Sequence, residues 1–241
     1  MSSTIAFLTI FPLKTGHNNL KIVARYMPLF PMIGLGIGVL AGSFGYIFLN
    51  VFPSTIAGFL TLGVLLLVTG LHHTDGLLDF GDGLMIKGTK KQKILTMGDK
   101  ITGTGGFGLG FIVLLTTAFS LSFLSGIVIL ALIVSETTAK ASMVLAASYG
   151  RSAYPGTGAI FITTMQSKHW TTRSVPIIFA LGIGFWSLGY IGLLTVFIGL
   201  LVCPVIIAIS YRSFGGLTGD VFGALNDLTR VVTLLAFVVL I

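Results

Sequence analysis

Long apolar runs, interrupted by three polar segments, limit what this chain can fold into. The stretches 28–50, 107–124 and 127–149 are each long enough for a helix that crosses a bilayer, which needs about 20 residues. Only 9% of the residues are charged and 54% are hydrophobic, whereas soluble domains carry about 25% charged residues. The expected fold is therefore an all-α polytopic membrane protein that forms a single domain over residues 1–241.

The apolar runs are numerous enough for about seven transmembrane helices. The stretch 175–209 is too long for one span, so we expect a break within 187–192; a kinked or re-entrant segment there would leave six spans. The predicted spans are residues 28–50, 54–72, 107–124, 127–149, two within 175–209, and 228–241. In the first span, Gly34, Gly38 and Gly42 recur every four residues, which predicts close contact with a neighbouring helix.

The connections on the two sides of these spans differ in charge. The basic segment 14–25 and the three polar loops fall on one side, while the connections near Pro53, Ser125 and residues 187–192 contain no lysine or arginine. Basic loops are retained in the cytoplasm, which predicts a polar face on the cytoplasmic side of the cell membrane. Because the cations behind the net charge of +7 are dispersed through these loops, we expect membrane lipid rather than nucleic acid as a partner.

Three of the seven carboxylates lie in one short stretch that follows the second span. On a helix that continues from that span, Asp75, Asp79 and Asp82 stand at i, i+4 and i+7 and share an arc of roughly 60°. His72 lies one turn earlier on the same face. Carboxylates so close together repel one another, and Mg²⁺, which binds carboxylates together with substrate phosphates, removes that repulsion. A solvated acidic helix end is the alternative; we predict a Mg²⁺ site.

The loop that follows, residues 83–106, is suited to binding an anion. It contains several lysines, and its glycines allow backbone N–H groups to approach a phosphate closely. The candidate diphosphate-binding residues are Lys90, Lys91, Lys93, Gly103 and Gly105. Beside a metal site, these residues indicate phosphoryl or nucleotidyl transfer on a membrane-associated substrate.

Charges inside a span would also be consistent with a transporter, because buried charges mark the ion path of many transporters. Glu136 and Lys140 are the only opposite charges clearly inside a predicted span. Their i, i+4 spacing, with the glutamate nearer the amino end, favours a helical ion pair; the alternative is that Lys140 reaches a substrate phosphate. The internal repeat typical of transporters is not visible, so we expect an enzyme.

The stretch 73–84 closely resembles the acidic signature of the cobalamin synthase family, the adenosylcobinamide-GDP ribazoletransferases. Further resemblances follow the family's order, at residues 7–12, 30–34, 94–99 with 103–104, 149–151, and 215–220 with 223–226. Some positions depart from the family pattern. Lys100 and Ile101 stand where a serine and an arginine are usual, and Lys140 stands where arginine is common. The phosphate-binding role of the family's loop arginine therefore does not transfer to this loop, where Lys100 is the candidate substitute.

The resemblance implies that a ribose hydroxyl of α-ribazole, or of its 5′-phosphate, attacks adenosylcobinamide-GDP and that GMP leaves. The corrinoid and nucleoside substrates would meet at a Mg²⁺ held by Asp75, Asp79 and Asp82, with Asp82 or Asp99 as the base. The residues expected to bind substrate are His72, Lys90, Lys91, Lys93, Lys100, Gly103, Gly105, Arg151, Asp220 and Asn226. CDP-alcohol phosphotransferases are the second candidate family, although Leu78-Asp79 replaces their Ala-Arg pair. The sequence leaves a homo-oligomer open.

Overall fold

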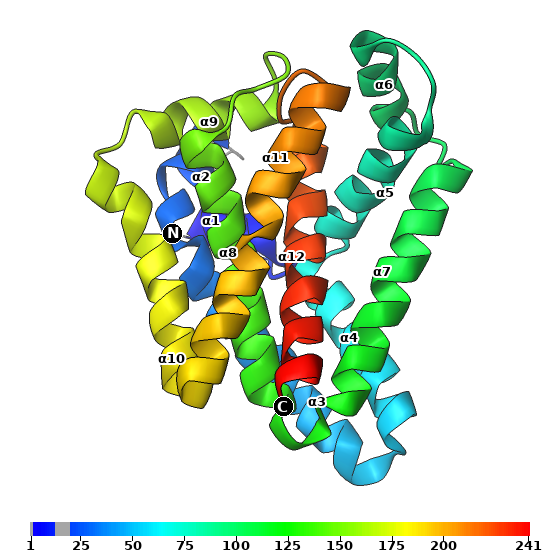
Figure 1. The fold of residues 1–241 in the computed structure, drawn as a ribbon, viewed down its shortest axis with the longest axis vertical. Coiled ribbons are helices and arrows are strands. Elements are labelled where there is room, and N and C mark those ends of the chain that lie inside the picture. The colour runs from blue at the N-terminus through cyan, green and yellow to red at the C-terminus, as the bar shows by residue number, and fades with distance from the viewer. Residues whose placement is uncertain (1, 13–19) are drawn as a thin grey trace.

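The computed structural model describes residues 2–12 and 20–241, which form a bundle of long helices with shorter helices at one end and one side (Figure 1). Residues 14–19 of the predicted basic segment lie outside the described residues. The α-helices are α1 (Ser2–Leu8), α2 (Leu20–Arg25), α3 (Phe30–Val51), α4 (Ser54–Thr69), α5 (His72–Met85), α6 (Lys90–Met97), α7 (Thr104–Phe123), α8 (Val128–Tyr149), α9 (Thr157–Gln166), α10 (Trp170–Leu200), α11 (Val202–Ser213) and α12 (Gly219–Leu240).

Five helical segments of the described chain are long and apolar enough to cross a membrane, and the bent pair α4 and α5 makes a sixth. One of the five, Trp170–Ser213, has 44 residues and would measure about 66 Å as one helix. Its backbone is non-helical at Leu188 and Gly189, and a side chain added at Gly184 would meet Val196. The two halves therefore double back on each other (Figure 1), which confirms the predicted break.

The three polar loops meet at one end of the bundle, where α6 and α9 also lie (Figure 1). Leu217, between α11 and α12, pairs with the loop after α8: its N–H donates to the carbonyl of Arg151 at 2.8 Å, and its carbonyl accepts from Ala153 at 3.0 Å. The Lys90 Nζ of α6 donates to the carbonyl of Tyr211 at 3.2 Å. The C-terminus lies at the opposite end. We call the end that carries α6 and α9 the polar end.

The last helix begins earlier than expected. We predicted a polar loop over 211–226 and a span from residue 228, whereas α12 begins at Gly219. Thr218 caps it, because its hydroxyl accepts the N–H of Val221 at 3.3 Å. The first turns of α12 are polar because they pack against other polar groups inside the bundle, and a hydropathy reading mistakes them for a loop.

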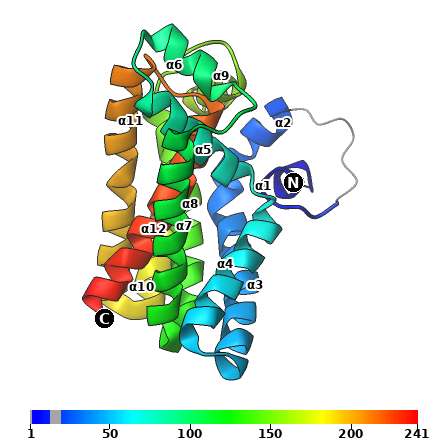
Figure 2. The same ribbon diagram turned by 90° about the vertical axis from the view of Figure 1, so that its right-hand side faces the viewer.

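The glycine ridge of α3 packs against α8, as its spacing predicts. A Cβ added at Gly34 would lie 2.5 Å from the Glu136 carbonyl oxygen, and one at Gly38 would lie 2.5 Å from the Leu132 carbonyl oxygen. The two backbones are therefore in direct contact, and α8 is buried along most of its length. Helices α1 and α2 cover the side of the bundle near α3 and α5 (Figure 2).

We expect Gly38→Ala to lower the free energy of unfolding by about 1–3 kcal/mol, because the new methyl group must displace the backbone of α8. The matched control is Gly36→Ala on the same helix, where an added Cβ meets nothing within 4 Å. Thermal unfolding of the detergent-solubilised protein measures both variants. Equal melting temperatures for the two variants would contradict the assigned contact.

Candidate active site

The acidic helix α5 does not continue α4 as we expected. The backbone at Gly70 and Leu71 is left-handed, with φ values of 65° and 61°, and the chain bends by 97° between the two helices. The left-handed conformation is natural for glycine but costs a residue such as leucine roughly 1–2 kcal/mol. We therefore end the membrane crossing at Thr69 and place α5, which carries the carboxylates, at the polar end.

Asp75 and Asp79 keep their predicted place on one face of α5, but Asp82 has another partner. Asp75 is exposed and Asp79 is partly buried, and neither carboxylate is hydrogen-bonded or ion-paired to the described part of the chain. Asp82 is buried; its two oxygens accept the N–H groups of Gly103 at 2.7 Å and Gly106 at 2.8 Å. Asp82 therefore caps the start of α7, where a negative charge also favours the helix dipole.

This cap changes the role of the glycine loop that we predicted to bind a diphosphate. A Cβ at Gly103 would lie 2.5 Å from Asp82 Oδ1, and one at Gly105 would lie 2.8 Å from the side chain of Met85. The N–H groups of Gly103 and Gly106 point at Asp82 rather than at an open site. The glycines of this loop thus bring α7 into contact with α5.

The backbone of a further acidic residue, Asp220, packs on the acidic helix from the start of α12. A Cβ added at Gly76 of α5 would lie 2.8 Å from the Asp220 carbonyl oxygen. Asp75 and Asp220 both stand in the first turn of their helices, where the dipole favours negative charge. Partial burial, followed by repulsion from Asp220, Asp75 and Asp82, raises the pKa of Asp79 to about 7. Asp220, which we predicted to bind a substrate hydroxyl, therefore joins the predicted metal ligands.

The carboxylates near α5 are donors suited to a hard divalent cation, but they are not gathered into a formed site. Carboxylate oxygens are what Mg²⁺ prefers, and a cation would relieve the repulsion that raises the pKa of Asp79. No three His, Cys, Asp or Glu side chains in the described ranges are grouped closely enough to hold a metal ion. Asp82 is turned toward α7, so Asp75, Asp79 and Asp220 are the available ligands, and their side chains would have to close around the ion.

Two of the predicted phosphate-binding lysines bind main-chain carbonyls in this structure. Lys93 Nζ donates to the carbonyl of Leu84 at 3.1 Å, near the C-terminal end of α5, where a cation complements the helix dipole. Lys90 Nζ donates to the carbonyl of Tyr211. These contacts hold α6 against α5 and α11.

Other predicted residues are exposed at the polar end. Lys91, Lys100 and Asp99 form no side-chain hydrogen bond or ion pair with the described residues. The guanidinium carbon of Arg151 lies 4.4 Å from the ring centre of Tyr211, the residue that Lys90 also contacts. His72 is exposed at the start of α5 and lines a cavity between α1, α9 and α12.

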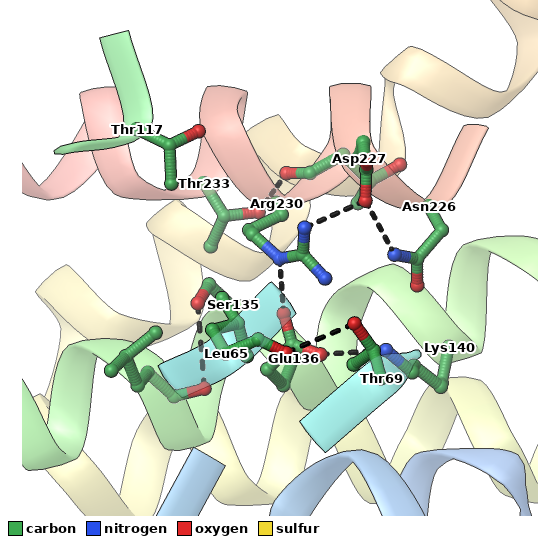
Figure 3. Close-up of polar contacts among 12 residues, drawn as sticks. Leu65, Thr69, Thr117, Ser135, Glu136, Lys140, Asn226, Asp227, Arg230 and Thr233 are labelled. Atoms are coloured by element: carbon green, nitrogen blue, oxygen red, sulfur yellow. Dashed lines mark hydrogen bonds and ion pairs between the residues drawn. The ribbon is translucent and has the colours of Figure 1, made fainter. Parts of the chain in front are cut away.

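Four charged side chains form a buried network in the centre of the bundle (Figure 3). Glu136 accepts from Lys140 Nζ at 2.6 Å and from Arg230 Nε, and Arg230 Nη1 donates to Asp227 at 2.6 Å. All four side chains are at most 2% exposed. The predicted Glu136–Lys140 ion pair is confirmed. Arg230 and Asp227 were missed as its partners, because the predicted last span began at residue 228 and left Asp227 outside it.

The network reaches the acidic helix through Asp227. Its Oδ2 accepts from the hydroxyl of Thr74 at 2.9 Å, one residue before Asp75. Asn226 is fully buried and donates to Asp227 Oδ1 at 3.0 Å, so it does not lie in the loop from which we predicted it to bind substrate. If the prediction had begun the last helix at Thr218, the i, i+3 spacing of Asp227 and Arg230 would have indicated their ion pair.

Lys140→Met leaves Glu136 and Asp227 to share Arg230, and we expect it to cost about 3–5 kcal/mol of stability, as breaking a buried pair does. Adding Glu136→Gln restores one acid and one base, so the double variant should recover much of the loss in a double-mutant cycle. Thermal unfolding and turnover should recover together. A double variant that is stable but inactive would instead assign Lys140 to the substrate.

Asp79→Asn should raise the melting temperature of metal-free protein, most clearly above pH 7. Ionised Asp79 is unfavourable in the folded state, because its pKa is raised from 3.8 to about 7. Asp79 takes up a proton as the pH falls below 7, so the gain should shrink and vanish near pH 4. Melting curves recorded in chelator from pH 4 to 8 test this, with Asp99→Asn, a change at an exposed carboxylate, as the control. A gain in melting temperature that does not depend on pH would contradict the assigned repulsion between Asp79 and its neighbouring carboxylates.

The sequence matches the model of the cobalamin-5-phosphate synthase family over residues 1–238. The adenosylcobinamide-GDP ribazoletransferase of Methanocella arvoryzae is 30% identical over 97% of this chain and 93% of its own length. The enzymes of that name from Methanosarcina barkeri and Thermococcus kodakarensis are 31% and 32% identical, over 99% and 97% of this chain and 91% and 96% of their own. No solved structure matches the chain. The match over nearly the whole length shows that the chain belongs to the cobalamin-5-phosphate synthase family.

Proposed function

We propose that this enzyme joins adenosylcobinamide-GDP to α-ribazole, or to α-ribazole 5′-phosphate, and releases GMP. The curated relatives carry the name of this transfer. The observation that carries the proposal in this chain is the packing of α12 on α5 at Gly76, which brings Asp220 near enough to Asp75 and Asp79 for their charges to interact, with exposed cations on the neighbouring loops. The product would be adenosylcobalamin or its 5′-phosphate.

In the proposed transfer, a ribose hydroxyl of the nucleoside forms an ester bond to the cobinamide-side phosphorus of adenosylcobinamide-GDP. The phosphoanhydride bond breaks, and GMP leaves with its electron pair. Bound Mg²⁺ would neutralise charge on the diphosphate as that bond breaks. Asp75, Asp79 and Asp220 would hold the ion. The carboxylates of Asp75 and Asp79 have no hydrogen-bond partner among the described residues, and that of Asp220 accepts the hydroxyl of Thr218 at 3.3 Å. Both oxygens of Asp82, in contrast, accept backbone N–H groups.

The remaining roles are divided between the loops of the polar end. Asp99 is exposed four residues before Gly103 and is the proposed acceptor of the hydroxyl proton, whereas Asp82 positions the start of α7. Lys91, Lys100 and Arg151 are exposed, and we propose that they bind the phosphates of the substrate.

We propose that the polar end faces the cytoplasm and that the protein resides in the cell membrane. The lysine-bearing loop before α7 and the arginine-bearing loop after α8 lie at this end. The connections at the other end, residues 52–53, 124–127 and 188–189, contain no lysine or arginine, and basic loops are retained on the cytoplasmic side.

Release of GMP from adenosylcobinamide-GDP in the presence of α-ribazole tests the proposal, measured in sealed vesicles that contain the protein. Inside-out vesicles should turn over substrate only with Mg²⁺, and right-side-out vesicles should not. Asp79→Asn should lower turnover by about 10²-fold or more, the usual effect of removing a group that stabilises developing charge. Near-normal turnover by that variant at limiting Mg²⁺ would reject the metal site, and absence of GMP release by the unmodified protein would reject the reaction.

A further inference from the structure

A cavity of about 520 Å³ lies between α1, α2 and α9 on one side and the amino-terminal ends of α5 and α12 on the other. Its volume is within the range of about 300–1,000 Å³ usual for small-molecule sites. It lies at the side of the bundle that α1 and α2 cover (Figure 2). None of the roles given above to the carboxylates or the exposed cations uses it.

Phenyl rings form much of the cavity wall. Phe161 of α9 is the centre of this group, with its ring centroid 5.6 Å from that of Phe7, 6.2 Å from that of Phe30 and 6.3 Å from that of Phe222. All four side chains line the cavity. Rings at such separations favour another flat aromatic group that packs against their faces and edges.

One residue of the cavity wall has a buried polar atom without a partner. His73 lines the cavity and is 6% exposed, and its Nδ1 has no hydrogen-bond partner among the described residues. Leaving such an atom unpaired costs about 1–3 kcal/mol. An imidazole ring carries at least one N–H donor in either tautomer.

Two residues that line the cavity stand close in sequence to the carboxylates of α5 and α12. His72, which lines it, stands three residues before Asp75 and therefore on nearly the same face of α5. Gly219, which also lines it, immediately precedes Asp220 on α12. The cavity therefore lies within one turn of Asp75 on α5 and of Asp220 on α12.

We propose that this cavity binds the aromatic base of the nucleoside substrate, with His73 donating a hydrogen bond to a ring nitrogen and the ribose directed toward Asp75 and Asp220. The inference rests on the proposed function, because it names the subsite of one substrate of that reaction. The base of α-ribazole is a benzimidazole. It is flat, bicyclic and uncharged, and it keeps one ring nitrogen as an acceptor after it is joined to ribose. Guanine fits poorly, since its several polar edge groups would face phenyl rings without partners.

Equilibrium dialysis of α-ribazole against the purified protein, without the second substrate, tests the subsite independently of turnover. Phe161→Leu and His73→Phe should each weaken α-ribazole binding about tenfold, the scale of one aromatic contact or one hydrogen bond. Binding of GDP should not change. The matched control is Phe111→Leu, because Phe111 is 54% exposed on α7 and does not line the cavity. If Phe161→Leu does not fold, Phe222→Leu replaces it.

The outcomes separate this inference from the proposed reaction. If the unmodified protein binds α-ribazole and both cavity variants weaken that binding, the subsite is supported even when no GMP is released. If α-ribazole binds with unchanged affinity to both cavity variants, the subsite is wrong while the reaction can still stand. Failure of the unmodified protein to bind α-ribazole, with a phospholipid retained in the cavity instead, would overturn the subsite in favour of a lipid site.

Discussion

Glu136 must be neutralised in the middle of the bundle, and the arrangement of the helices around it follows from that requirement. An ionised carboxylate has no water to solvate it at this depth, so its partners must come from the protein. Lys140 comes from the same helix, but Arg230 comes from α12 and brings Asp227 with it. Asp227 in turn binds Thr74 of α5. One buried charge thus sets how α8, α12 and α5 are placed relative to one another.

The same arrangement also depends on glycine, because a residue without a side chain lets two helices approach closely. Gly34 and Gly38 let α3 approach the backbone of α8, and Gly76 lets α5 approach α12 at Asp220. In a membrane, where the hydrophobic effect does not drive helices together, such close packing and interhelical hydrogen bonds take its place. The carboxylates are therefore positioned by contacts that lie beneath them, and the glycines of the acidic stretch contribute to the geometry as much as its aspartates do.

Much of this architecture could be predicted from the sequence, because apolar run length and four-residue spacing are local properties. These two properties predicted most of the spans, the break in the long hairpin, the glycine ridge and the Glu136–Lys140 pair. The bend at Leu71 could not be predicted, since leucine rarely adopts a left-handed backbone. The capping role of Asp82 and the approach of Asp220 depend on which helices pack together, which residue spacing does not reveal. The polar start of α12 misled the hydropathy reading because its partners lie on other helices.

The segment between α5 and α7 is fastened to α5 at several points. Near its start, Lys93 binds the last carbonyls of α5; in its middle, Met97 packs on Gly83; at its end, Asp82 holds Gly103. A loop held in this way cannot move far without α5, so the distance between its basic side chains and the carboxylates stays nearly constant. A diphosphate would meet an arrangement that is largely preorganised, and little of the binding free energy would be lost in ordering the loop around it.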